Sequence, residues 1–95
     1  MTKTVFKTRK FNTETYTFYL HTPDYAGEKG CLGVEISPYI TVETPENSFG
    51  YSDTFFYMHK NKSGYYAWRN HLPWITKKII EVCKDYAEKL PYSVQ

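Results

Sequence analysis

The spacing of the apolar residues changes near Pro73, and this change strongly limits the folds that the chain can adopt. After Pro73, apolar residues recur at intervals of three and four, which is the period of an amphipathic helix: Ile75, Ile79, Val82, Cys83 and Tyr86. Pro73 suits the first turn of a helix, and Pro91 stands where a helix can end. The pattern therefore predicts one helix of about four turns at the carboxyl end of the sequence.

The earlier part of the sequence alternates polar and apolar residues, which is typical of strands. TKTVFKTRKF and ETYTFYLH flank Asn12 and Thr13, so they predict a hairpin. The same alternation predicts further strands at CLGVEI, at Ile40 and Val42 after Pro38, and at DTFFYMHK and YYAWR. We therefore expect an α+β fold, an antiparallel sheet of four to five strands with one C-terminal amphipathic helix packed on one face.

Two registers are open to the first hairpin. A two-residue loop would place Lys7 and Arg9 on the face of Tyr16 and Phe18, whereas a three-residue bulged loop would place Phe6 there instead. We favour the second, because it creates one apolar face: Phe6, Tyr16, Phe18 and Leu20. The residues then predicted to point outward are Val5, Lys7, Arg9, Thr15, Thr17 and Tyr19.

The composition is that of a folded protein. Aromatic residues make up 19% of the 95 residues, far more than disordered chains contain. A chain of this length has room for one core, so residues 1–95 are expected to form a single domain. MTKTVFKTRKF lacks the apolar run of a signal peptide, and no stretch approaches the roughly 18 apolar residues that cross a bilayer. We expect a cytoplasmic protein without membrane association, whose Cys31 and Cys83 stay reduced.

The net charge of +2 conceals three blocks of opposite sign. Residues 1–12 carry +4, residues 13–53 carry −6 and residues 54–80 carry +5. Such blocks can form a basic and an acidic patch on one small surface, which steers encounters with a charged partner. Ten of the twelve basic residues are lysine, so only Arg9 and Arg69 can make the forked contacts that read guanine edges.

The patterns for catalysis and metal binding are incomplete. Structural zinc sites use close pairs of ligands, whereas the histidines and cysteines here, including His59 and His71, occur singly. Cys31 could act as a nucleophile only with a histidine such as His21 beside it. The glutamates and glycines lack the spacing for acid–base chemistry or for a phosphate-binding loop. We therefore expect no enzymatic activity, no metal site and no cofactor.

The number of aromatic residues predicts a binding surface. Ten Tyr and six Phe exceed what a core of this length can hide, and aromatic side chains dominate interface energetics. Trp68 and Trp74 flank the passage from the last strand into the helix, where we expect them to pin the helix across the sheet. We predict a non-enzymatic protein that acts through a protein–protein interface. The residues expected to bind the partner are Lys7, Arg9, Tyr19, Tyr57, Lys60, Lys62, Tyr65, Tyr66 and Arg69.

An alternative function is nucleic-acid binding, in which a sheet face stacks bases on aromatic rings while nearby lysines neutralise phosphates. That surface would consist of Lys7, Arg9, Tyr19, Tyr57, Lys60 and Lys62. The acidic middle block and the scarcity of arginine oppose it.

The frequent Lys, Asn, Tyr, Phe and Ile have AT-rich codons, which indicates a low-GC bacterium or its phage. The favoured interpretation is therefore a phage inhibitor of a host defence machine.

Overall fold

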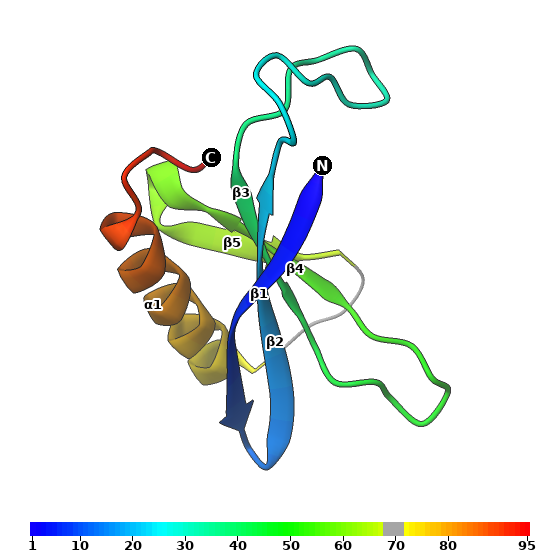
Figure 1. The fold of residues 1–95 in the computed structure, drawn as a ribbon. Helices are drawn as coiled ribbons and strands as arrows, with labels where there is room; N and C mark the ends of the chain where they lie inside the picture. Colours follow the sequence, from blue (N-terminus) through cyan, green and yellow to red (C-terminus); the bar gives the residue numbers. More distant parts are fainter. Residues whose placement is uncertain (68–71) are drawn as a thin grey trace.

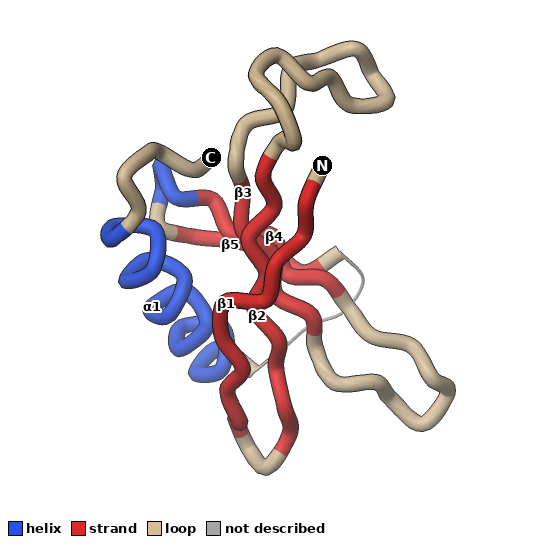
Figure 2. The backbone as a smooth tube through the Cα atoms, in the orientation of Figure 1, coloured by secondary structure: helices blue, strands red, loops and turns tan. Residues whose placement is uncertain are grey.

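One antiparallel sheet and one helix form the protein (Figure 1). The computed structural model describes residues 1–67 and 72–95. The strands follow one another in the sheet in sequence order: β1 (Thr2–Phe11), β2 (Glu14–Thr22), β3 (Tyr39–Glu43), β4 (Thr54–Met58) and β5 (Ser63–Tyr66). The helix, α1 (Pro73–Lys89), lies on one side of the sheet, as the tube in Figure 2 shows. The predicted α+β fold is confirmed.

The first hairpin has the register that we did not favour. Asn12 and Thr13 form a two-residue turn with φ angles of 52° and 67°, as a type I′ turn requires. Lys7 therefore pairs with Phe18, and Arg9 pairs with Tyr16. The bulge that we expected at the turn lies between Val5 and Lys7 instead. The prediction that Lys7 and Arg9 point away from the apolar face was wrong, because a one-residue shift exchanges the two faces of a strand.

The third strand begins later than predicted. CLGVEI is not a strand, and Leu32 and Val34 are 89% and 69% exposed. Gly33 has a φ angle of 75°, which interrupts an extended backbone, and Glu35 makes only an isolated bridge to Lys29. Pairing with β2 starts at Tyr39, directly after Pro38. The predicted Ile40 and Val42 lie inside β3 and are buried, so this part of the prediction is confirmed.

The second hairpin joins β4 to β5 through a short 3-10 turn, η1 (His59–Asn61), followed by Lys62 in the left-handed region with a φ angle of 49°. A side chain at position 64 would collide with the ring of Phe55, so glycine lets β5 approach β4 closely. The strand β5 begins two residues earlier than the predicted YYAWR. Trp68, Arg69 and His71 lie outside the described residues. Trp74 is 49% exposed, so the prediction that it pins the helix on the sheet was wrong.

The core lies between the sheet and α1. Fully buried side chains come from β2, β3, β4 and α1: Phe18, Ile40, Val42, Phe55, Ile79 and Cys83. Every fourth residue of α1 from position 75 is buried: Ile75, Ile79, Cys83 and Ala87. Ile75, Ile79 and Cys83 confirm the predicted apolar stripe, and Ala87 extends it. Val82 and Tyr86 are half-buried at its edge. Within the described residues, no helix is long and apolar enough to cross a membrane.

Candidate binding surface

The sheet face turned away from α1 is not covered by another element (Figure 1). We call it the open face. Strand alternation places there the residues that neighbour the buried ones, and cross-strand pairing joins Tyr19 to Thr41, Thr41 to Phe56, and Phe56 to Tyr65. The open face consists of Lys3, Val5, Thr8, Lys10, Thr15, Thr17, Tyr19, His21, Tyr39, Thr41, Glu43, Thr54, Phe56 and Tyr65. Five of these fourteen side chains carry aromatic rings.

The rings of the open face pack in pairs across strands. His21 stacks on Tyr39 with ring centroids 4.3 Å apart, and Phe56 stacks on Tyr65 with centroids 5.2 Å apart. The ammonium of Lys3 lies 4.1 Å from the centroid of the Tyr19 ring. Such cross-strand pairs stabilise a sheet and hold the rings in fixed positions. The open face is therefore a preformed aromatic surface.

Glu43 carries the negative charge of the open face. Its carboxylate accepts a hydrogen bond from the Tyr19 hydroxyl at 3.0 Å and another from the Ser52 hydroxyl at 3.3 Å. Burial, followed by the hydrogen bond to Glu43, raises the pKa of Tyr19. These side chains border a hollow of about 270 Å³ that extends to Phe56 and Lys3. The hollow therefore offers both aromatic rings and a carboxylate.

His21 is buried beneath this surface. One ring nitrogen, Nε2, lies 2.7 Å from the hydroxyl of Thr41, on the adjacent strand. Burial and the nearby ammonium of Lys3 lower the pKa of His21, so the imidazole is neutral at pH 7. A neutral ring can stack flat on Tyr39 without the cost of a desolvated charge. His21 therefore supports the aromatic surface.

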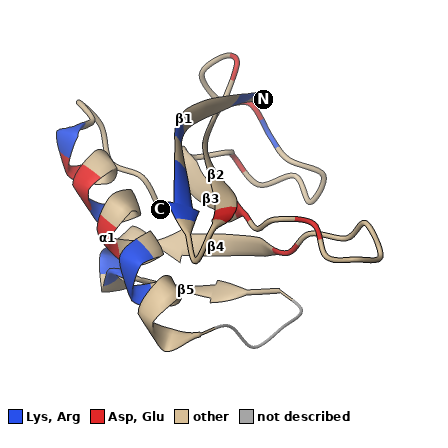
Figure 3. Ribbon diagram, turned by 90° about the horizontal axis from the view of Figure 1, so that it is seen from below, with Lys and Arg blue, Asp and Glu red and all other residues tan. Residues whose placement is uncertain are grey.

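Two long loops, residues 23–38 and 44–53, border the open face and extend away from the side on which α1 lies (Figures 1 and 3). They expose large apolar side chains. Leu32 is 89% exposed in the first loop, and Phe49 and Tyr51 are 81% and 72% exposed in the second. Tyr25 and Val34 are also exposed. Among the described residues, the five most exposed large apolar side chains all belong to these two loops, whereas Leu72, Trp74 and Tyr92 are less exposed. Exposed apolar side chains of this size mark candidate interaction sites.

Hydrogen bonds fold both loops locally. In the loop 44–53, the side chain of Asn47 accepts hydrogen bonds from the backbone N–H groups of Phe49 and Tyr51, at 2.9 and 3.1 Å. In the loop 23–38, the N–H of Gly30 donates to the carbonyl of Val34 at 2.9 Å. The apolar side chains of the loops are therefore held on an ordered backbone. Less conformational entropy is then lost when a partner binds.

The sequence prediction placed two residues correctly on the open face, Tyr19 and Tyr65. Tyr57 is 3% exposed in the core, where burial raises its pKa to about 12, and Tyr66 packs edge-on against Phe55. Neither of these two tyrosines lies on the open face.

The predicted basic residues lie elsewhere on the molecule. Lys7 and Arg9 border a cleft between β1 and α1. Lys60 and Lys62 occupy the turn between β4 and β5, where the Lys62 ammonium is 3.9 Å from Glu88. Arg69 lies outside the described residues. The structure therefore does not bring the predicted set together.

The prediction missed Phe56, Tyr39 and the apolar loop residues. Phe55 and Phe56 are adjacent aromatics on opposite faces of β4, so the sequence did signal a second aromatic face there. Leu32 and Val34 were missed because they were assigned to a strand.

In residues 1–67 and 72–95, no three histidine, cysteine or acidic side chains gather closely enough to hold a metal ion. Comparisons with protein-family models, with curated proteins and with solved structures find no match to this chain.

Proposed function

We propose that this chain is a binding protein that engages a protein partner through the open face and its two bordering loops. The observation that carries the proposal is the exposure of Leu32, Phe49 and Tyr51 beside an uncovered aromatic sheet face. Large apolar and aromatic side chains supply most of the free energy of protein interfaces when a partner removes them from water. We propose that the protein acts by occupying its target and not by catalysis.

The charge around the open face supports a partner with a basic surface. Figure 3 shows acidic residues on the two loops and on the strands beside them, whereas β1 carries lysines and arginine and α1 carries charges of both signs. Glu43 stands on the open face, and Glu35 and Glu46 lie on the exposed loops. Complementary charge raises the association rate and selects the partner, while the apolar contacts supply affinity.

The positions of the basic residues disfavour the nucleic-acid alternative. In the nucleic-acid alternative, Lys7 and Arg9 neutralise phosphates beside Tyr19. Both side chains instead project from the opposite side of the sheet. The basic residue next to the Tyr19 ring is Lys3, and the carboxylate of Glu43 accepts a hydrogen bond from the Tyr19 hydroxyl. A carboxylate at this position repels a phosphate backbone, and an aromatic surface needs several adjacent cations to hold one.

The finer proposal is that the target belongs to a host cell and that the chain is an inhibitor made by a phage, acting in the cytoplasm. It rests on the codon-related composition of the sequence and on the large apolar side chains that the two loops expose to a partner. An inhibitor of this kind needs only a rigid surface that occludes a functional site of its target.

Affinity capture from source or host cells, followed by binding measurements with the captured protein, tests the proposal. Tyr51→Ser and Phe49→Ser should each weaken binding by about tenfold or more if they are interface anchors. Tyr92→Ser is the matched control, because Tyr92 is an exposed aromatic residue beyond the end of α1. Equal losses in the loop variants and in Tyr92→Ser would refute the assignment of the surface.

A further inference from the structure

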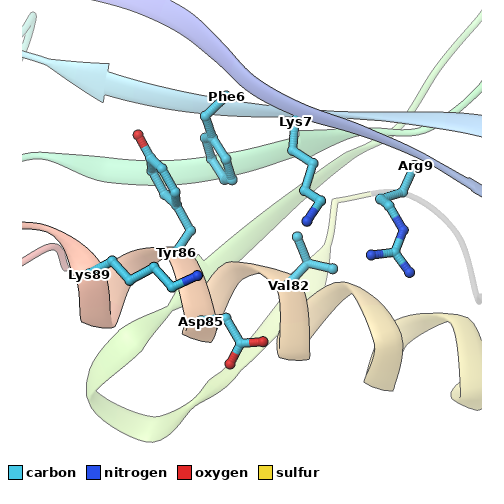
Figure 4. A pocket seen from close by; sticks show the side chains of 7 residues that line it. All are labelled: Phe6, Lys7, Arg9, Val82, Asp85, Tyr86 and Lys89. Carbon is cyan, nitrogen blue, oxygen red and sulfur yellow. The ribbon is translucent and has the colours of Figure 1, made fainter.

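A second hollow lies on the other side of the sheet, between β1 and α1 (Figure 4). Its volume is about 280 Å³. We call it the β1–α1 cleft. It is lined by Phe6, Lys7, Arg9, Val82, Asp85, Tyr86 and Lys89. Three of these side chains are cations and one is a carboxylate, so the cleft is predominantly positive.

The bulge in β1 brings this charge to the helix side. Because the extra residue lies between Val5 and Lys7, the pairing partner of Lys7 is the buried Phe18. Arg9 pairs with the buried Tyr16 and so projects from the same face as Lys7. Figure 4 shows both side chains pointing from β1 towards α1.

Two stacked rings close one part of the cleft. Phe6 lies flat on Tyr86, with centroids 3.7 Å apart and planes 3° apart. Lys89 lies one helical turn beyond Asp85, and its side chain runs along α1 towards the space below Lys7 (Figure 4). The stacked rings and Val82 form an apolar wall, next to which charged groups interact more strongly than in open water.

The cations of the cleft have no ionic partner in residues 1–67 and 72–95. Among the described residues, Lys7, Arg9 and Lys89 form no ion pair within 4.0 Å, although Asp85 lines the same cleft. The guanidinium of Arg9 lies 5.7 Å from the centroid of the Phe11 ring, which leaves its N–H groups free to donate. Three unpaired cations that border one hollow create a site for an anion.

We propose that the β1–α1 cleft binds a small phosphate, either inorganic phosphate or the phosphoryl end of a monoester. Arg9 would donate two parallel hydrogen bonds to phosphate oxygens, and Lys7 and Lys89 would supply point charges. Asp85 would accept a hydrogen bond from a protonated phosphate oxygen. Sulfate has no such proton at neutral pH, so Asp85 repels it. The proposal does not depend on the proposed function, because the cleft and the open face lie on opposite sides of the sheet.

Titration with inorganic phosphate at constant ionic strength, followed by backbone amide NMR shifts, tests the site. We expect saturable shifts in residues 6–9 and 82–89. Arg9→Gln and Lys7→Gln should each weaken binding by roughly tenfold, the loss of one charge-assisted contact. Lys10→Gln is the control, because it removes the same charge from the neighbouring strand position that faces away from the cleft. Equal weakening by Lys10→Gln, or no saturation at all, would overturn the proposal.

Selectivity and the source of the phosphate are tested with three further ligands. Sulfate should bind more weakly than phosphate, and Asp85→Asn should reduce or remove that difference. Glycerol 2-phosphate that binds more tightly than inorganic phosphate would identify a monoester as the ligand, and the reverse order would identify the free ion. Shifts of the same amides by a single-stranded oligonucleotide, without any by phosphate, would overturn the small-ligand proposal in favour of nucleic acid.

Discussion

At the scale of single residues, the burial of His21 links folding to pH. Its lowered pKa means that the folded protein disfavours the protonated ring, whereas the unfolded chain accepts the proton near pH 6.5. The neutral ring therefore contributes stability that is present above pH 6.5 and is lost as the pH falls through the folded-state pKa. We expect the urea midpoint of the wild type to fall between pH 7.5 and 5.5, and the fall to be smaller in His21→Gln. Identical falls in both proteins would contradict this role.

Thr13 is a strained residue of the first hairpin turn. Its φ angle of 67° is unfavourable for a branched side chain, and glycine at this position gives the Asn-Gly pair that type I′ turns prefer. Thr13→Gly is expected to stabilise the protein by about 1 kcal/mol, measured by urea unfolding. Thr15→Gly, inside β2, is the control and should destabilise it. A loss of stability in Thr13→Gly would argue against this turn and its register.

Single-residue sequence reasoning found only part of the candidate site. Tyr19 and Tyr65 were correctly predicted to face outward. Tyr57 was predicted to face outward but is buried, because adjacent aromatic residues in β4 do not reveal which of them faces the helix. That choice depends on the register between strands, which the sequence of one strand does not contain.

At the scale of elements, α1 is held by a stripe of buried aliphatic side chains. Ile79 is fully buried, and truncating a buried isoleucine leaves a cavity. Ile79→Ala should lower the free energy of unfolding by about 2 to 5 kcal/mol in urea unfolding. Lys78→Ala, at the exposed neighbouring position, should change it by less than about 0.5 kcal/mol. Equal stability of the two variants would mean that α1 does not cover the core.

The elements differ in how well their sequences predict them. The helix was predicted with its start at Pro73 and its buried stripe, because a 3.6-residue period over 17 residues is a strong signal. The strand at Ile40 and Val42 was predicted, but CLGVEI showed the same alternation without pairing to any strand. Alternation over six residues cannot distinguish a strand from a loop whose Gly33 turns the backbone.

At the scale of the whole molecule, the separation of the aromatic face from Lys7 and Arg9 predicts how binding depends on salt. An interface built on the open face and the apolar loops should persist at about 0.5 M salt, where exposed charges are screened. Random single-stranded oligonucleotides should not bind at micromolar concentration in physiological salt. Micromolar oligonucleotide binding that is lost in Lys3→Glu would contradict the protein-binding assignment and support nucleic acid.

The location of the interface is the central claim, and hydrogen–deuterium exchange of the chain with its captured partner tests it most directly. Binding through the open face should slow exchange in residues 23–38 and 44–53, and leave exchange in α1 unchanged. The backbone N–H groups of these loops exchange more readily than those within the sheet, so protection there is easy to detect. Protection confined to β1 and α1, with the two loops unaffected, would contradict the account.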